Sequence, residues 1–535
     1  MQTTNPVPGT IGAFADTKIK TRTGLIARAI QHRDRVSTKW QGPKKRGAGH
    51  NADVTPPPTF RATTNQSCAF NPLVWGSRAP KVGAPVGVHF DSGELVGCDP
   101  LAYFLANMIQ NPSIAFMSNP AAGKSTAMRV MMTGMAAHGV INMVIGDIKD
   151  EHGGTIEKLG GNKVSVSPAD GTLNVLDPGG IIKALKLVNA KLPVGDPLGD
   201  RVRTKLLEDM HMRRTEAVCS LVSIHRGAPV VGVEDTIVGR ALNNMYTADP
   251  EGVPILSDLL DVLTEPSDEL LRIAAPRRDL TREQKVERYF QKVDALLSDL
   301  ASLCVSDTLG KMFNGPTRVT DRHGNITSEL DYEKGLAFDI SGIDPNQPQL
   351  LAAAYTATWA VAFGLIYTSH RLADAGLAPR RQFMAWLDEF WQPLTASKGM
   401  VDRTSRMGRT NRTAGVGIAY AIHTLDDLEA LPDKADVNKA KGLIKRCGMQ
   451  WIGGLPYDEV MAIHQRLTRL SGSEIEQLVR WYNPQFKETG GWIPGRGCFL
   501  LKIGEETGIP IRVVLTETEQ RLGLHETSKR LIDAA

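Results

Sequence analysis

The nine residues from Ser118 to Thr126 constrain the fold of this 535-residue chain more than any other segment. They read Ser-Asn-Pro-Ala-Ala-Gly-Lys-Ser-Thr. The apolar run 113–117 precedes them, and an apolar helical pattern begins at Thr126. A strand, a loop ending in Gly-Lys-Ser and a helix form the arrangement in which backbone N–H groups at a helix N-terminus bind phosphate. We therefore expect a phosphate-binding loop in this segment.

The residues of this loop have distinct expected roles. Lys124 would reach the β- and γ-phosphates of a nucleotide, and the Ser125 hydroxyl would hold Mg²⁺. The loop and the first helical turn supply the other cofactor-binding residues, namely Asn119, Pro120, Ala121, Ala122, Gly123 and Thr126. The consensus begins with Gly, whereas this loop begins with Ser118, which can also make a tight turn. A chance match in a surface loop is the alternative interpretation, and the flanking patterns argue against it.

An apolar strand pattern ending in two carboxylates supplies the second half of a nucleotide site. Residues 383–389 read Phe-Met-Ala-Trp-Leu-Asp-Glu. Asp388 would bind Mg²⁺ through water, and Glu389 would be the base that orients and polarises the attacking water. An acidic pair after a strand is also common as the charge pair of a helix N-terminus. The presence of both motifs in the expected order favours the catalytic interpretation.

Two further features lie near the acidic pair. The strand pattern 415–422 leads to His423, where many motor ATPases place a polar residue that senses the γ-phosphate, although it could be a solvated strand-end histidine. Between these motifs an arginine recurs at every third residue, at Arg403, Arg406, Arg409 and Arg412. In a helix they would form a stripe along one side. Arg409 is our candidate for an arginine finger, and a channel lining or a solvated face are the alternatives.

Strand and helix patterns alternate along most of the chain and predict an α/β fold with a parallel sheet. The strand patterns are 140–147, 163–167, 335–341, 382–387, 415–422, 448–453, 497–501 and 511–515, with a hairpin expected around 83–98. Helical periodicity dominates from about 181 to 309. We expect a P-loop NTPase core of the RecA-like kind, residues 60–180 and 331–535, with a mostly helical insertion at 181–330. The insertion helps to explain the 264 residues between Lys124 and Asp388, a spacing that compact kinases and GTPases lack.

Charge is unevenly placed along the sequence. Residues 1–66 hold eleven Lys and Arg against three Asp, a balance of +8, whereas the whole chain carries +4. We expect residues 1–59 to be a basic, flexible arm that contacts anionic lipid or nucleic acid, or that is simply solvated. The six cysteines lie far apart without a C-x-x-C pair, which favours reduced thiols in a cytosolic protein and no zinc site.

One uncharged segment, 350–369, is long enough to cross a bilayer. It contains several Tyr and Thr residues, and it shortly precedes the strand that carries the acidic pair. A buried helix is therefore the favoured interpretation over a membrane span.

With these motifs in view, the chain resembles the TraC-type conjugation ATPases of type IV secretion systems, within the HerA–FtsK clade and in their actinobacterial style. The resemblance covers about residues 60–531. Beyond the nucleotide motifs it rests on Asp99-Pro100, Asn111-Pro112-Ser113, Asp147 with Glu151, Leu173–Pro178, Phe313–Thr317 and Gly495–Leu501. Two positions depart from the family pattern: Ser118 replaces Gly, and His423 stands where Gln is usual. We expect the N-terminal docking domain of larger relatives to be missing or reduced to the basic arm.

The resemblance implies an ATP-driven motor that assembles as a homo-hexamer, with nucleotide at subunit interfaces and Mg²⁺ as its only metal. It further implies membrane-embedded secretion components as partners, a cytoplasmic place at the inner face of the membrane, and transfer of DNA or protein across the envelope. Without the resemblance, the residues predict only hydrolysis of Mg²⁺-ATP by a P-loop domain.

Two alternatives to this function stay open. One is a DNA-pumping translocase of the FtsK or coupling-protein kind, although coupling proteins usually carry N-terminal transmembrane helices and this sequence shows no such pattern. The other is a nucleotide-binding scaffold with weak hydrolysis, against which the intact Lys124, Asp388 and Glu389 argue.

Overall fold

The computed structural model describes residues 77–249, 251–396, 400–402, 404, 415–431, 433–482, 495–521 and 523. All of these belong to the second of two compact units, residues 65–535. The expected basic arm, residues 1–59, lies outside the described residues, as do Arg403, Arg406, Arg409 and Arg412.

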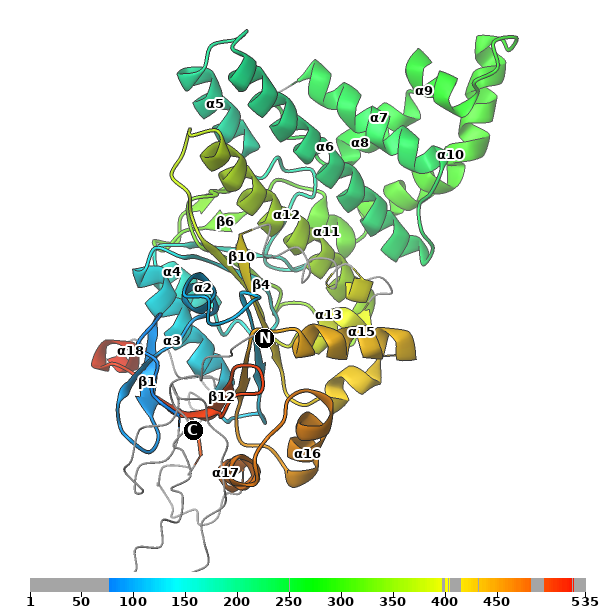
Figure 1. The fold of residues 1–535 in the computed structure, drawn as a ribbon. Coiled ribbons are helices and arrows are strands. Elements are labelled where there is room, and N and C mark those ends of the chain that lie inside the picture. Colours follow the sequence, from blue (N-terminus) through cyan, green and yellow to red (C-terminus); the bar gives the residue numbers. More distant parts are fainter. Residues whose placement is uncertain are drawn as a thin grey trace, which may run out of the picture. The chain divides into compact units, whose positions relative to one another are not determined.

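A 13-stranded sheet runs through the described part of the chain in the order β2-β1-β13-β12-β11-β3-β10-β9-β4-β8-β5-β6-β7 (Figure 1). Its central strands are parallel. They are β3 (Ser113–Met117), β4 (Ile141–Asp147), β5 (Asn162–Ser165), β8 (Leu336–Asp339), β9 (Phe383–Leu387), β10 (Val416–Ile422) and β11 (Met449–Ile452). The predicted α/β fold with a parallel core is confirmed.

Antiparallel strands extend the sheet at both edges. They are β1 (Pro85–His89), β2 (Leu95–Gly97), β12 (Cys498–Lys502) and β13 (Ile509–Val513) at one edge, and β6 (Val319–Thr320) and β7 (Ile326–Thr327) at the other. The expected hairpin is β1–β2. Strand β13 begins two residues earlier than its apolar pattern indicated, because Ile509 pairs with Leu501 of β12. The pair β6–β7 was not predicted, since strands of two residues are too short to show a periodicity.

Most of the parallel strands are largely apolar because helices cover both faces of the sheet. Every residue of β3 is buried, and its side chains alternate between two separate cores. Ile114 and Phe116 join the core that contains the methionines of α3 (Lys124–Ala137). Ala115 and Met117 join the larger core that contains α12 (Pro348–Asp374).

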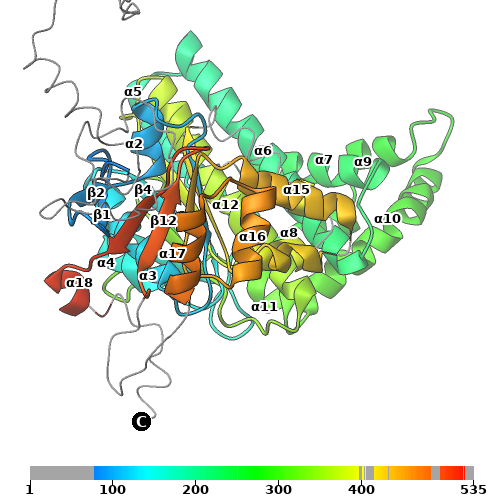
Figure 2. The same ribbon diagram turned by 60° about the horizontal axis from the view of Figure 1, so that its bottom comes forward.

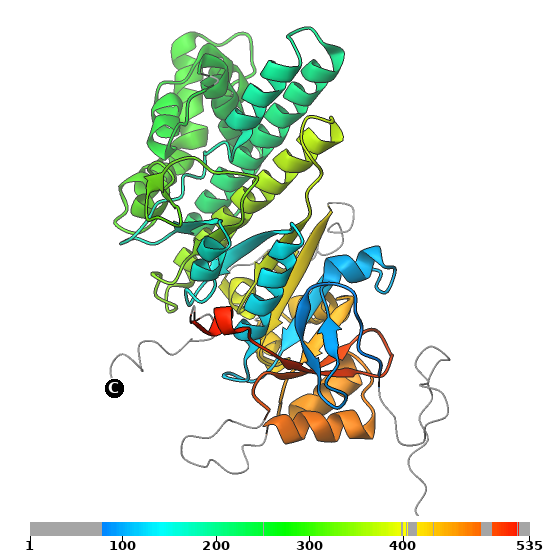
Figure 3. The ribbon, with the colours of Figure 1, turned by 90° about the vertical axis from the view of Figure 1, so that its left-hand side faces the viewer.

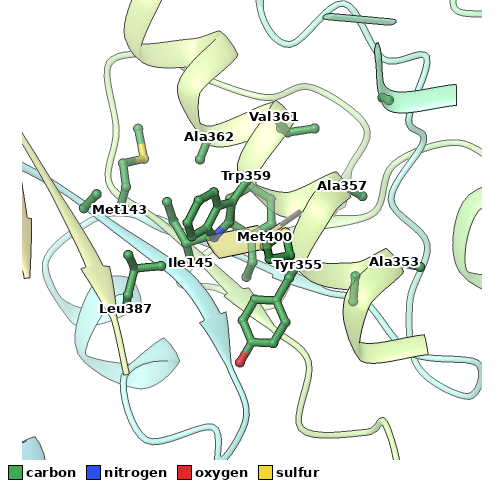
Figure 4. Packing of buried hydrophobic residues seen from close by; sticks show 14 of the residues in the cluster. Met143, Ile145, Ala353, Tyr355, Ala357, Trp359, Val361, Ala362, Leu387 and Met400 are labelled. Atoms are coloured by element: carbon green, nitrogen blue, oxygen red, sulfur yellow. The ribbon is translucent and has the colours of Figure 1, made fainter. Parts of the chain in front are cut away.

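Helix α12 is the uncharged segment whose sequence is apolar enough for a membrane span. In its most apolar window, 83% of the residues are buried inside the protein. Figure 4 shows Tyr355 and Trp359 of this helix packed near Ile145 of β4 and Leu387 of β9. The helix thus covers the sheet beside the strand that ends in the acidic pair.

Between β5 and β6 the chain is helical, as the sequence predicted for most of this stretch. It forms α5 (Ile181–Lys191), α6 (Pro197–Arg226), α7 (Val233–Ala248), α8 (Leu256–Thr264), α9 (Asp268–Ala274), α10 (Arg282–Val305) and α11 (Leu309–Phe313). Helix α6 packs along α12, and Figures 1 and 3 show the helices α5–α11 (teal to green) beyond the end of the sheet where α12 lies. Helix α6 starts at Pro197 with Asp196 as its cap, and α10 starts with a capping box of Thr281 and Gln284.

The Leu173–Pro178 element ties the beginning of this helical stretch to its end. Thr317 Oγ1 donates a hydrogen bond to Asp177 Oδ2 at 2.7 Å, and Asn174 Nδ2 donates to the carbonyl oxygen of Pro254 at 2.9 Å. Burial raises the pKa of the Asp177 carboxyl, although the bonds from Gly179 and Thr317 oppose that rise. In this structure the element therefore has a structural role.

The remaining helices flank the sheet. They are α2 (Pro100–Leu105), α4 (Gly153–Lys158), α13 (Trp391–Ala396), η1 (Asp426–Ala430), α15 (Lys434–Lys445), α16 (Tyr457–Arg466), α17 (Gly472–Tyr482) and α18 (Glu517–Arg521). Figure 2 shows α16, α17 and β12 side by side, in agreement with the contacts between them.

Candidate nucleotide-binding site

Four neighbouring parallel strands bring the expected site residues together. In the sheet β3 lies beside β10, β10 beside β9, and β9 beside β4. Their carboxyl ends lead into the loop 118–123, His423, the pair Asp388–Glu389 and the loop 148–152, respectively. Ligands of parallel α/β proteins bind at this edge of the sheet. Residues that lie hundreds of positions apart in the sequence therefore meet at one place.

The loop after β3 has the backbone that a phosphate-binding turn needs. Ala121 and Gly123 have positive φ angles of 66° and 99°, and α3 begins immediately afterwards at Lys124. A side chain at position 123 would also crowd the backbone nitrogen of Gly497, 3.2 Å from the site of a Cβ atom. That nitrogen donates a hydrogen bond to the carbonyl oxygen of Ala122 at 2.8 Å. The C-terminal segment around Gly497 thus supports the loop from one side.

Ser118 replaces the first glycine of the consensus without backbone strain. The described non-glycine residues with positive φ are Asn107, Ala121, Asp150 and Glu389, and Ser118 is not among them. Serine can adopt the conformation of this position, so the departure does not distort the loop. Asn119 and Pro120 are partly or fully exposed, which leaves the outer surface of the loop open to a ligand.

Lys124 links the loop to the acidic pair. Its Nζ atom lies 3.1 Å from Oδ1 of Asp388 and 3.8 Å from Oε1 of Glu389. All three side chains are less than 10% exposed. A lysine in such a place can exchange its carboxylate partners for the phosphates of a nucleotide. Ser125 and Thr126 follow on the first turn of α3 and are partly exposed.

Asp388 is held as a carboxylate by partners on both oxygens. Oδ1 faces Lys124 and accepts the backbone N–H of Glu389 at 2.9 Å, and Oδ2 lies 3.0 Å from Nε2 of His152. Burial alone would raise the pKa of the Asp388 carboxyl, but Lys124 and His152 outweigh it and hold that pKa well below its usual range. An ionised carboxylate suits a hard cation such as Mg²⁺.

Glu389 is surrounded by donors. Its Oε1 lies 2.5 Å from Nζ of Lys149 and 3.0 Å from Nε2 of His423, and its Oε2 accepts the indole N–H of Trp391 at 3.0 Å. Burial would raise the pKa of the Glu389 carboxyl, but the bond to His423 and the charge of Lys124 lower it to about 2. His423 also places Nδ1 3.4 Å from the carbonyl oxygen of Ser118. The expected sensor therefore bridges the loop and the expected base.

The loop after β4 contributes two groups that the sequence analysis did not assign, Lys149 and His152. Asp147 shapes this loop by accepting the backbone N–H groups of Glu151, His152 and Gly153 at 3.1, 2.7 and 3.1 Å. Burial would lower the pKa of the His152 imidazole, but Asp388 and Asp147 raise it overall, so the ring holds its second proton more firmly than a free histidine. In the sequence, the signal for this loop was Asp147, a carboxylate at the end of a buried strand.

One group of possible metal ligands lies at this edge among the described residues. Glu151, His152 and Asp388 each offer a ligand atom, and these atoms lie within 4.8 Å of one another. His152 already bonds to Asp388, so the group also has a purely hydrogen-bonded explanation. Arg409 lies outside the described residues, and its expected role as an arginine finger stays a prediction.

The fold of the chain is similar to that of a solved structure, VirB4. VirB4 of Thermoanaerobacter pseudethanolicus superposes with a TM-score of 0.53 at 16% sequence identity, over 83% of this chain and 99% of that one. The bacterial conjugative coupling protein TrwBΔN70 superposes with a TM-score of 0.41 at 10% identity, over 83% of this chain and 96% of that one. Only the first of these similarities is high enough to establish a shared fold. No family model matches the sequence, and no curated protein matches it.

Proposed function

We propose that this chain is the ATP-hydrolysing motor of a conjugative or type IV secretion machine. The observation that carries the proposal is the meeting of Lys124, Asp388, Glu389 and His423 at the carboxyl ends of β3, β9 and β10. The fold shared with VirB4 supports this particular kind of motor. The substrate would be ATP, with Mg²⁺ as its metal.

The chemistry assigned to the residues follows from their contacts. When ATP binds, Lys124 would leave Asp388 and Glu389 for the β- and γ-phosphates. Ser125 and Asp388 would hold Mg²⁺, which neutralises charge on the phosphates. Glu389 would orient a water molecule and accept its proton while the water oxygen bonds to the γ-phosphorus. The bond between that phosphorus and the bridging oxygen breaks, and ADP keeps the electron pair.

His423 would report the state of the nucleotide. It contacts Glu389 through one ring nitrogen and the loop residue Ser118 through the other. A change in the loop on binding or release of phosphate would therefore reach the base through a single imidazole. Histidine can act in this way in place of the glutamine that is usual in the family, because both of its ring nitrogens can form hydrogen bonds.

The assembly and the place of action belong to the same proposal. We propose a homo-hexamer in which Arg409 of one subunit reaches the nucleotide of the next. Membrane-embedded secretion components would be its partners at the cytoplasmic face of the membrane, and DNA is a candidate cargo. We further propose that residues 60–180 and 331–535 form the motor core, that 181–330 form an insertion, and that 1–59 form a basic arm.

The test is ATP hydrolysis by the purified protein, alone and with single- or double-stranded DNA. Hydrolysis that is indifferent to DNA and is lost in Asp388→Asn supports a motor driven through protein partners. Glu505→Gln, which removes an exposed carboxylate, is the matched control and should behave like the wild type. Strong stimulation by DNA would instead favour a DNA-pumping translocase. No hydrolysis under any condition would favour a scaffold.

A further inference from the structure

Lys149 makes the shortest ionic contact with the expected base. Its Nζ lies 2.5 Å from Oε1 of Glu389, whereas His423 and Lys124 approach the same oxygen to 3.0 and 3.8 Å. The proposed hydrolysis gives no role to Lys149. The other oxygen of Glu389 is occupied by Trp391. Both carboxylate oxygens are therefore bonded before any water molecule arrives.

The backbone of the loop that carries Lys149 is held by several contacts, whereas the Lys149 side chain is half exposed. Three backbone N–H groups bond to Asp147 within the loop, and Asp150 pairs with Lys163 at 2.7 Å. Lys163 is in turn 2.9 Å from Asp339 of β8. The side chain of Lys149, by contrast, is 49% exposed. It can swing into solvent without moving the backbone.

Glu389 adopts a backbone conformation that its surroundings must maintain. Its φ of 46° lies in the left-handed region, which costs a non-glycine residue about 1–2 kcal/mol. Such outliers persist only where contacts hold them, and they are concentrated at sites that switch. The contacts that Lys149, His423 and Trp391 make with the Glu389 carboxylate can hold this conformation in place. Loss of one of them would make a second arrangement of the residue accessible.

Binding of ATP leaves Lys149 as the closest remaining cation on the base. Lys124 would move to the phosphates, and the attacking water must then bond to a carboxylate oxygen of Glu389. Lys149 occupies one of those oxygens. We propose that Lys149 is a positioning residue that holds Glu389 in a hydrolysis-incompetent arrangement until nucleotide binding displaces it. This inference rests on the proposed ATPase function.

The first test compares steady-state hydrolysis by three variants. Lys149→Ala should lower the KM for ATP by about threefold or more with an unchanged kcat, because ATP binding no longer has to displace the lysine from Glu389. Lys149→Arg should restore the wild-type KM, since it keeps the cation. Lys186→Ala, which removes an exposed lysine far from the site, is the charge-matched control. An unchanged or higher KM, or a lower kcat, in Lys149→Ala would overturn the proposal.

The second test needs no catalysis. Lysine acylation by an N-hydroxysuccinimide ester, read by peptide mass spectrometry, should modify Lys149 slowly in the nucleotide-free protein. Glu389→Gln, or saturation with Mg²⁺ and a non-hydrolysable ATP analogue, should speed the modification. Equal reactivity in all three states would overturn the proposal. If the wild type shows no hydrolysis at all, the proposed function fails and this test still decides whether Lys149 restrains Glu389.

Discussion

Two lysines are buried against carboxylates in the described part of this molecule, and the two sites are built differently. Lys502 of β12 donates to both carboxylate oxygens of Glu474, at 3.2 and 3.5 Å, and to the carbonyl oxygen of Glu506 at 2.5 Å. Glu474 also accepts the backbone N–H groups of Ser471 and Gly508 at 2.7 and 2.6 Å. The pair is satisfied entirely by the fold, so no ligand is needed to complete it.

At the nucleotide site, by contrast, the lysine and the carboxylates are held mainly by ion pairs and hydrogen bonds between side chains. Lys124 faces both Asp388 and Glu389, and each of those carboxylates has a further partner from the loop after β4, His152 for Asp388 and Lys149 for Glu389. The partners can be exchanged, because phosphate oxygens replace carboxylate oxygens around an ammonium group without loss of geometry. A buried ion pair with backbone partners is thus structural, whereas a cluster of shared side chains is suited to binding and release.

The largest effect on stability is expected where the pair is structural. Glu474→Ala should lower the free energy of unfolding by about 3–5 kcal/mol, because it leaves the Lys502 ammonium buried without a counter-charge. Thermal denaturation measures this as a lower Tm. Glu429→Ala removes an exposed carboxylate, 44% of whose side chain is accessible, and should cost about 1 kcal/mol or less. Equal costs for the two variants would contradict the structural role of the Glu474–Lys502 pair, because the pair would then stabilise the fold no more than an exposed ion pair does.

At the nucleotide site we expect a smaller change in free energy, and it concerns the binding of the nucleotide rather than folding. Lys124→Ala should weaken binding of Mg²⁺-ATP by about 10–100-fold, since a charge-assisted hydrogen bond contributes about 1.5–3 kcal/mol. Isothermal titration calorimetry measures this, with Lys186→Ala as the matched control. An unchanged affinity would contradict the assignment of the loop as the phosphate site.

The smallest expected effect is a pH-dependent change in stability that involves Glu459 on α16. Burial, followed by the nearby charge of Asp426, raises the pKa of Glu459 to about 6. Because the folded state favours the protonated Glu459 carboxyl, its contribution to the free energy of unfolding is present below the usual pKa of a glutamate. That contribution is lost as the pH rises through about 6. Glu459→Gln should therefore raise the Tm at pH 8 and have little effect at pH 5. The gain should stay below about 1 kcal/mol because solvent screens this partly exposed side chain, and the same shift at both pH values would contradict it.

Much of the fold could be predicted because its signals are local. Strand β3 is apolar throughout since both of its faces are buried, and the Gly-Lys-Ser turn follows it directly. The buried α12 could be recognised from its Tyr and Thr residues and its position before β9. The roles proposed for Lys124 and Asp388 likewise rest on motifs that span a few residues.

The remaining contacts of the site depend on strand order, which local patterns do not encode. Lys149 reaches Glu389 only because β4 lies beside β9, although 240 residues separate the two in the sequence. His152 reaches Asp388 for the same reason. The tolerance of Ser118 could not be foreseen either, because it depends on a φ angle that only the folded loop reveals. Sequence motifs identified the residues expected to bind the nucleotide, whereas the order of the strands in the sheet determines which other side chains contact those residues.

The central claim, that Glu389 is the base of an ATP-hydrolysing site, is tested most directly by Glu389→Gln. Glutamine keeps the size of the side chain but cannot accept the proton of water. We expect turnover to fall by about 10²–10⁴-fold, the usual contribution of general base catalysis, while calorimetry shows ATP still bound. Turnover equal to that of the wild type would show that Glu389 is not the base.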